Sequence, residues 1–300
     1  VRPTRIPQPA IRAIGTMTSS RMLTFGAPPL RDVDECPARR VIAQPALPPG
    51  ERLSYNHAEN GGRSILTSSD ERVLVTGACG QIGSELTLAL RARHGVHRVI
   101  ASDIRSPEIS CWTDDGPFVS LDVCDRAALQ SLVEAEKIRT IYHMAAILSA
   151  TGEENPQAAW RVNIQGLLNV LETAVATGSL RVFCPSSIAV FGPTAPRTNT
   201  PQATILQPTT MYGVTKVAGE LLGDYYVQRY GIDVRGVRYP GIISSETPPG
   251  GGTTDYAVDV FYQALRDRRY TFFVRPDTVL PMMYMPDCIK ATLDLMDADP

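Results

Sequence analysis

Three side chains in the second half of the chain could together remove a proton from an alcohol. Tyr212 and Lys216 are spaced i, i+4 in the segment MYGVTK, so on a helix they lie on one face. A phenol with an ordinary pKa near ~10 is mostly protonated at neutral pH, but a nearby ammonium favours its ionised form. Lys216 is the candidate ammonium, and Ser187 in PSSIAVFG could hold the substrate oxygen within reach of Tyr212. The alternative interpretation makes Tyr212 an amphipathic surface residue and Ser187 a turn residue.

A glycine-rich segment, TGACGQIG, could bind the phosphates of a dinucleotide. It follows a predicted strand and opens a predicted helix, which is the context that such a glycine pattern needs. We expect Gly77 to allow a tight turn, Gly80 to let the backbone approach a pyrophosphate, and Gly83 to let the helix pack on the strand. The N-terminus of the helix supplies N–H donors and a positive potential. A strand, turn and helix with capping glycines is the simpler alternative.

Acidic residues at two predicted strand ends could bind the adenosine half of such a dinucleotide. Asp103 ends the second strand, where an acid can accept hydrogen bonds from the ribose and repel a 2'-phosphate. This favours NAD over NADP, although Arg105 could accommodate that phosphate. Asp122 and Val123, at the end of the third strand, could face the adenine, or Asp122 could be a solvated strand-end acid.

The scaffold that must position these residues begins at Arg72. Short β-branched runs alternate there with amphipathic helical stretches, and this alternation predicts βαβ units and a parallel sheet. We expect an α/β, Rossmann-type doubly wound fold. The predicted strands are residues 72–76, 97–102, 118–122, 139–145, 180–186 and 233–239. Predicted helices include residues 81–93, 156–177 and 211–229.

Residues 241–300 are expected to form part of a smaller, substrate-binding lobe over the carboxyl edge of the sheet. The glycine- and proline-rich segment SSETPPGGG precedes a helix near 255–268, a strand near 270–274 and a helix near 286–297. Residues 71–240 would then be the NAD-binding domain.

Residues 1–70 have a different composition, rich in proline and arginine and without sustained periodicity. We expect a disordered extension that does not join the core. Its first thirty residues carry four arginines and no acid, which is typical of a mitochondrial transit segment. An extension without a targeting role is the alternative, and a cytoplasmic location would accompany it.

Composition excludes several classes of protein. The chain has 29 basic and 31 acidic residues, a net charge of -2 that cannot hold a polyanion, so we expect no nucleic acid partner. No apolar run approaches the ~20 residues that a membrane span needs. The six cysteines and four histidines show no metal-ligand spacing, so we predict no metal site. A small-molecule substrate fits better.

The assembled motifs resemble the extended short-chain dehydrogenase/reductase family over roughly residues 72–300. The resemblance is carried by TGACGQIG, Asp103, PSSIAVFG, YGVTK and RYPGII. Within that family, FGPTAPR, YGVTKVAGELLGDYY, RYPGIISSETPPGGGTTDYAV and LPMMYMPDCIKATLDLM look like the short-chain L-threonine 3-dehydrogenases. The resemblance implies NAD-dependent oxidation of L-threonine to 2-amino-3-oxobutanoate without a metal, in mitochondria for eukaryotic members, and a homodimer. It also implies that this chain lacks part of the substrate lobe.

Several site residues are assigned by this resemblance. Tyr212 matches the proton acceptor, Lys216 its partner and Ser187 the serine of the family. Ile242 should lie near the nicotinamide, and Ser149, Thr253 and Thr254 match positions that bind the amino acid. The cofactor positions are Gly77, Gly80, Gln81, Ile82, Gly83, Asp103 and Asp122.

Two other functions use the same residues differently. A nucleotide-sugar epimerase of this family would need a long basic pocket for a diphosphate, whereas residues 241–256 contain no lysine or arginine. A non-catalytic NAD-binding regulator should have lost the tyrosine or the lysine, and both are present. A small zwitterionic substrate therefore remains the preferred interpretation.

Overall fold

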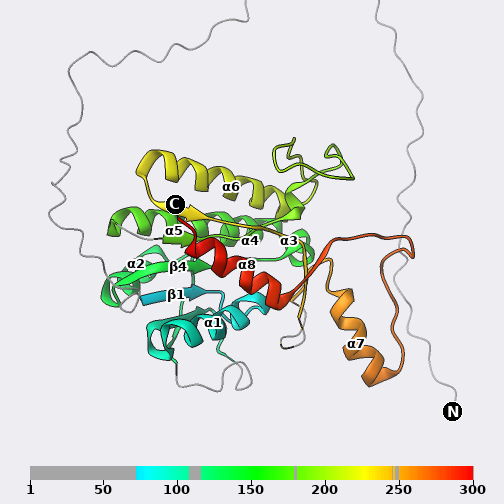
Figure 1. Cartoon of the computed structure of the whole chain (residues 1–300), viewed down its shortest axis with the longest axis horizontal. Helices are drawn as coiled ribbons and strands as arrows, with labels where there is room; N and C mark the ends of the chain where they lie inside the picture. The colour runs from blue at the N-terminus through cyan, green and yellow to red at the C-terminus, as the bar shows by residue number, and fades with distance from the viewer. Residues whose placement is uncertain (1–71, 108–115, 179–180, 245, 247–249, 300) are drawn as a thin grey trace, which may run out of the picture. The chain divides into compact units, whose positions relative to one another are not determined.

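A sheet of six parallel strands forms the centre of the structure (Figure 1). Its spatial order is β3 (Phe118–Ser120), β2 (Val99–Asp103), β1 (Arg72–Thr76), β4 (Ile138–His143), β5 (Arg181–Phe183) and β7 (Asp233–Arg235). The order reverses between β1 and β4, where the carboxyl ends of parallel strands leave a crevice for ligands. The predicted α/β, Rossmann-type fold is confirmed.

This computed structural model describes residues 72–107, 116–178, 181–244, 246 and 250–299. The described residues all belong to one unit, Ser64–Pro300. The extension predicted over residues 1–70 lies outside them.

Alternating side chains of β1 show how the sheet separates two helical layers. Val73 and Val75 face one core, which contains α1 (Gln81–His94) and α8 (Met285–Asp297). Leu74 faces the opposite core, with α2 (Arg126–Ala135), α5 (Gly166–Thr177) and α6 (Met211–Tyr230). Both faces are buried, so the strands are apolar throughout rather than alternating with polar residues.

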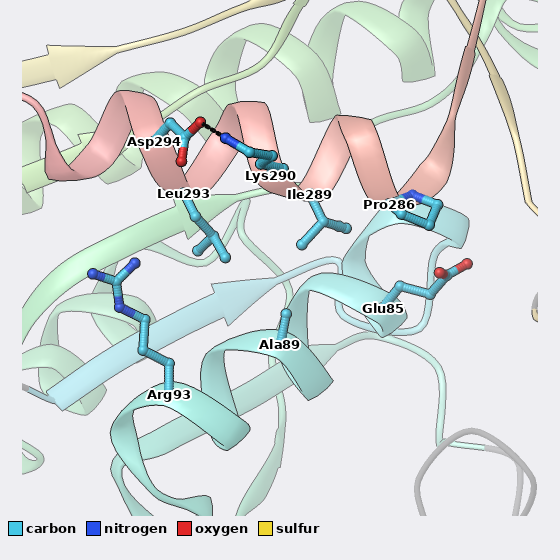
Figure 2. Close-up of a pocket in the computed structure, with 8 residues that line it drawn as sticks. All are labelled: Glu85, Ala89, Arg93, Pro286, Ile289, Lys290, Leu293 and Asp294. Carbon is cyan, nitrogen blue, oxygen red and sulfur yellow. Dashed lines mark hydrogen bonds and ion pairs between the residues drawn. The ribbon is translucent and has the colours of Figure 1, made fainter.

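Helix α8 packs beside α1 and shares its core, although it falls within the range expected to form the substrate lobe. Figure 2 shows Ala89 of α1 facing Ile289 and Leu293 of α8 across a groove of about 470 Å³. Lys290 and Asp294 form an ion pair on its rim. None of the predicted site residues lines this groove.

The strand predicted over residues 180–186 ends early, and β6 (Ser186–Ser187) follows as a separate strand. Pro185 has no amide proton and cannot continue the hydrogen-bond ladder. The strand predicted over residues 233–239 is also divided, into β7 and β8 (Arg238–Tyr239). Strand β8 pairs in parallel with β6. Two shorter strands, β9 (Gly241–Ile243) and β10 (Met282–Tyr284), form a further parallel pair.

The other differences also have local causes. A 3₁₀ turn over Val96–Arg98 delays the start of β2. The helix predicted over 156–177 is α4 (Pro156–Trp160), a π turn over Arg161–Gln165 and then α5. The strand predicted over 270–274 is wrong. Phe272 and Phe273 pack edge-on against Tyr256 of α7 (Tyr256–Asp267), at centroid distances of 6.1 and 5.7 Å.

Candidate active site

Helix α6 carries Tyr212 and Lys216 on successive turns beside the end of β5. Its N-terminus is fixed by Thr210, whose hydroxyl oxygen accepts a hydrogen bond from the Gly213 amide at 3.1 Å. The Lys216 Nζ lies 5.4 Å from the centroid of the Tyr212 ring. The structure therefore brings the two residues together on one face.

Ser187 lies at the end of β6, next to this pair in the fold. Lys216 donates a hydrogen bond to the carbonyl oxygen of Pro185 at 2.7 Å, two residues before the serine. The Ser187 Oγ accepts a hydrogen bond from the Ala189 amide at 3.2 Å, and its own proton stays available to donate. Gly213 packs on the Ala189 carbonyl so closely that a β-carbon there would collide with it. These contacts join the segment of Ser187 to the first turns of α6.

A second set of polar residues supports this segment and escaped the sequence analysis. Ser186 donates a hydrogen bond to Glu220 Oε1 at 2.5 Å, and Arg238 of β8 binds both Glu220 oxygens at 2.7 Å. Burial raises the pKa of the Glu220 carboxyl, but hydrogen bonds from Arg238 and Ser186, with the charges of Arg238 and Lys216, outweigh it and hold this pKa below its ordinary value. The spacing of Glu220 four residues after Lys216 was the available signal.

Asn163, in the π turn before α5, is a further supporting residue that the sequence analysis missed. Its amide accepts a hydrogen bond from the Ile147 N–H at 2.8 Å and donates to the Ile147 carbonyl at 3.0 Å. It also donates to Thr215 Oγ1 at 3.1 Å. One buried side chain thus joins the loop after β4 to α6 beside Lys216.

His143 ends β4 and is buried behind the site. Its Nδ1 is hydrogen-bonded with Thr76 Oγ1 at 3.0 Å. Burial, with a smaller contribution from the charge of Lys216, lowers the pKa of His143 to about 3. The imidazole is therefore neutral at physiological pH and belongs to the scaffold.

A cavity of about 520 Å³ reaches this cluster, lined by Lys216, His143 and Asn163 among others. Ala145, Ala146 and Pro185 also line it, and these follow the carboxyl ends of β4 and β5. The cavity therefore includes the edge of the sheet where ligands bind in this architecture, and it continues along α6 to Val234 of β7. Tyr212 and Ser187 are not among the residues that line it.

The glycine segment lies at the adjacent crevice, between β1 and α1. Gly77 has a φ of +67°, and a β-carbon there would lie 2.5 Å from the Ala145 nitrogen. A β-carbon at Gly83 would collide with the Gly77 carbonyl oxygen. Both positions therefore require glycine for packing alone, whereas Gly80 has only the Gly77 oxygen nearby, at 3.2 Å.

Several features of this turn fit a dinucleotide. In the described part of the chain, no side chain caps the N-terminus of α1, and its first turn holds no acid. The Gln81 Nε2 is buried without a hydrogen-bond partner among the described residues. An N-terminus without a side-chain cap and the amide nitrogen of Gln81 suit a pyrophosphate. Ile82 packs inward against the core of α1.

Asp103 ends β2 beside this turn, with a nearly buried side chain. Its carboxylate accepts hydrogen bonds from the Cys79 amide at 3.0 Å and from the Arg105 amide at 3.0 Å. The Arg105 guanidinium also contacts both oxygens, at 3.2 and 3.3 Å. A ribose would have to share these oxygens with Arg105, whose side chain is 61% exposed and can move.

The remaining predicted cofactor residues take different positions. Asp122 is exposed and accepts a hydrogen bond from the Cys124 amide at 2.8 Å. The Val123 side chain is buried against Gly166, and its carbonyl accepts from Asn169 at 2.8 Å. Ile242 of β9 is buried in the core that contains α1 and α8. Val123 and Ile242 thus have clear packing roles.

Two of the residues predicted to bind the substrate, Ser149 and Thr253, meet at one loop. Ser149 begins α3 (Ser149–Glu154), and its Oγ accepts a hydrogen bond from the Thr253 amide at 3.3 Å. Asp255 Oδ2 accepts from the amides of Gly251 and Gly252 at 2.8 and 2.7 Å, which fixes the loop. Thr254 packs on Gly241. Ser149 and Thr253 are adjacent, while Thr254 faces β9.

The described residues contain no cluster of histidine, cysteine, aspartate and glutamate that could hold a metal ion. No helix among them is long and apolar enough to cross a membrane.

Residues 73–299 match the model of the NAD dependent epimerase/dehydratase family. An uncharacterized epimerase/dehydratase of Staphylococcus haemolyticus is 54% identical over 229 residues, which cover 76% of this chain and 72% of the relative.

Two solved structures are similar at the same level. The L-threonine dehydrogenase from Phytophthora infestans is 54% identical with a TM-score of 0.72, covering 76% of this chain and 73% of that one. A GalE-like L-threonine dehydrogenase from Cupriavidus necator is 53% identical with a TM-score of 0.73, at the same coverage.

Proposed function

Because the chain belongs to the NAD-dependent epimerase/dehydratase family, we propose that it is an oxidoreductase that converts L-threonine to 2-amino-3-oxobutanoate with NAD. The observation that carries this proposal is the identity above 50% with two solved L-threonine dehydrogenases, in a chain that places Tyr212 and Lys216 together at the sheet edge.

The glycine turn and its surroundings would hold NAD. The backbone at Gly77, Gly80 and Gly83, with the buried amide of Gln81, suits the pyrophosphate, and Asp103 suits the adenosine ribose. Asp122 follows the carboxyl end of the neighbouring strand β3, and its side chain is exposed. When bound, NAD accepts the hydride that leaves the carbinol carbon of the substrate.

Tyr212, Lys216 and Ser187 would handle the proton of the same reaction. Ser187 donates a hydrogen bond to the substrate oxygen and holds it near Tyr212. As the C–H bond breaks, the ionised Tyr212 oxygen takes the hydroxyl proton, and the C–O bond becomes a carbonyl. Lys216 would supply a positive charge beside the phenol, since its Nζ lies 5.4 Å from the ring centroid.

A small amino acid suits the loop that follows β9 better than a nucleotide sugar does. Ser149, Thr253 and Thr254 offer hydroxyl and amide groups. Residues 241–256 contain two charged side chains, Glu246 and Asp255, and both are acidic. A diphosphate would need cations there. The epimerase alternative is therefore second, and it is favoured by the family description and by the name of the uncharacterized Staphylococcus haemolyticus relative.

The decisive assay mixes the protein, NAD and L-threonine and follows NADH formation by absorbance, with L-serine and UDP-galactose in parallel. The proposal predicts NADH with L-threonine and no epimerisation of the sugar. Epimerisation without NADH release would establish the sugar epimerase instead. NAD binding without either reaction would favour a regulator.

A mitochondrial location is part of the proposal and is supported by the arginine-rich, acid-poor first thirty residues. A fluorescent fusion of residues 1–70 tests it, and uniform cytoplasmic fluorescence would contradict it.

A homodimer is also proposed, supported by apolar side chains that α6 exposes. Leu221 and Tyr225 are 65% and 53% exposed. Sedimentation of the wild type and of Leu221→Glu tests this, and a monomeric wild type would contradict it.

A further inference from the structure

The short segment Pro185–Ser187 is held from two sides. From α6, Lys216 donates to the Pro185 carbonyl at 2.7 Å, and Glu220 accepts from the Ser186 hydroxyl at 2.5 Å. From the other side, the Ser186 amide donates to the Val237 carbonyl at 2.8 Å. The segment that carries Ser187 is thus anchored by side chains one helical turn apart.

Glu220 and Arg238 form an ion pair at the back of this segment. Arg238 Nε and Nη2 bind the two Glu220 oxygens, each at 2.7 Å, which is the bidentate geometry of a strong pair. The side chains are only 23% and 19% exposed. Arg238 also donates to the Gln202 carbonyl at 2.8 Å and lies 5.2 Å from the Phe191 ring centroid, so it has little freedom to move.

The two charges of this pair cancel close to Lys216. Glu220 follows Lys216 by one helical turn and Tyr212 by two, and both Glu220 and Lys216 line the same cavity. An unpaired carboxylate here would oppose ionisation of the Tyr212 phenol, and an unpaired guanidinium would favour it. With both present, their effects on Tyr212 oppose each other, and Lys216 is the cation placed against its ring.

We propose that Glu220 and Arg238 are positioning residues that act as one neutral pair: they hold Pro185–Ser187 in place and leave Lys216 as the effective charge beside Tyr212. This inference rests on the proposed function for the roles of Tyr212 and Ser187. It assigns a role to two residues that take no direct part in the proposed hydride and proton transfers.

Other charged and titratable groups surround the Tyr212–Lys216 pair. They are the same in the wild type and in the Glu220 and Arg238 variants that test the proposal. Glu153 of α3 accepts a hydrogen bond from the Met211 amide at 2.6 Å, at the start of the same helix. His143 and Cys184 lie within the electrostatic range of Lys216, and both are uncharged at neutral pH because burial lowers the pKa of the histidine and raises that of the cysteine. The cavity wall also includes Asp224 of α6 and Arg235 of β7.

The test measures the pH at which the Tyr212 phenol ionises, in protein labelled with ¹³C at the tyrosine ζ carbon. The Tyr212 resonance is assigned by its loss in Tyr212→Phe. Glu220→Gln should lower the ionisation midpoint and Arg238→Gln should raise it, each by roughly 0.3 to 0.7 pH unit, because Glu220 lies about 12 Å along α6 from Tyr212 and Arg238 is bound to Glu220. The double variant should return to within ~0.2 unit of the wild type, since the two charges then vanish together.

Opposite shifts are the result that a merely structural role would not produce. Shifts in one direction in both single variants, or no shift in either, would overturn the proposal. If Arg238→Gln fails to fold, Glu220→Gln keeps the size of the side chain and must by itself lower the midpoint. Arg238→Lys keeps the charge but not the bidentate contact, and it should leave the midpoint unchanged.

Arg181→Gln is the matched control, because it also removes a partly buried ion pair. Arg181 binds Asp233 at 3.0 Å at the amino end of β5, away from the site, so its loss should not move the midpoint. The titration needs no substrate. A wild type that makes no NADH from L-threonine would therefore count against the proposed function, and a failed titration pattern against this inference.

Discussion

Lys216 donates a hydrogen bond to the carbonyl oxygen of Pro185 at 2.7 Å, and this contact fixes the ammonium between the Tyr212 ring and the segment that carries Ser187. A lysine side chain loses substantial conformational freedom when it is held in one geometry. Because the protein holds it before any ligand arrives, binding NAD and substrate need not supply that cost. The arrangement is preorganised for proton transfer from an alcohol.

The first prediction concerns the phenol. Tyr212→Phe removes the proton acceptor, and turnover with L-threonine should fall by roughly 10² to 10⁴-fold. The NAD dissociation constant, measured by calorimetry, should change less than about twofold. Tyr225→Phe is the control, since Tyr225 is an exposed tyrosine of the same helix and its loss should leave both quantities unchanged. A Tyr212→Phe variant that keeps most of its rate would place the base elsewhere.

The second prediction concerns the glycine turn. In Gly83→Ala, the added methyl group meets the Gly77 carbonyl, so the turn must distort. We expect NAD affinity to fall at least about tenfold and stability to fall by about 1–3 kcal/mol. Gly95→Ala, at the other end of α1, is the control: with a φ of +97° and open space around it, it should lose stability but keep NAD affinity. Equal NAD affinities in the two variants would argue against phosphate binding at this turn.

The third prediction concerns the choice between NAD and NADP. Asp103→Asn removes the charge that repels a 2'-phosphate and weakens the hold on Arg105, whose guanidinium then becomes available to that phosphate. The ratio of kcat/KM for NAD over NADP should fall by about 10 to 100-fold. Adding Arg105→Ala should cancel the gain for NADP. An unchanged ratio in Asp103→Asn would show that the ribose binds elsewhere.

The fourth prediction concerns pH and stability. His143 has a pKa of about 3 in the folded chain because it is buried, whereas an unfolded histidine titrates near 6.5. The unfolded state therefore binds more protons below pH 6.5, and folding stability falls as the pH drops from there toward 3. Between pH 7.5 and 5.5 the loss should be about 1.4 kcal/mol by urea unfolding. His143→Gln should lack this part of the pH dependence, and an identical slope in both proteins would contradict the assignment.

Much of the fold follows from local patterns in the sequence. The alternation of β-branched runs with amphipathic helices locates the sheet, because each strand of a parallel sheet is apolar on both faces. The i, i+4 spacing of Tyr212 and Lys216 places them on one face wherever a helix forms. The helix predicted over residues 211–229 agrees with α6, which the structure shows capped by Thr210 at its start and ended by Gly231 in the left-handed conformation.

The features that could not be predicted depend on contacts between distant segments. Glu220 resembles any charged residue on a helix until Arg238 and Ser186 are brought beside it by the β6–β8 pairing. Asn163 acts through a π turn, which no composition rule predicts. Residues 270–274 have strand-like composition, but their aromatic rings pack on Tyr256 instead of pairing with a neighbouring strand.

The source of the transferred hydride tests the central claim most directly. L-threonine carrying deuterium at its carbinol carbon is incubated with the protein and NAD, and the reduced cofactor is analysed by mass spectrometry. The account predicts NADH that is one mass unit heavier, formed by the wild type and nearly absent with Tyr212→Phe. Reduced cofactor without deuterium, or deuterated cofactor formed equally well by the variant, would contradict it.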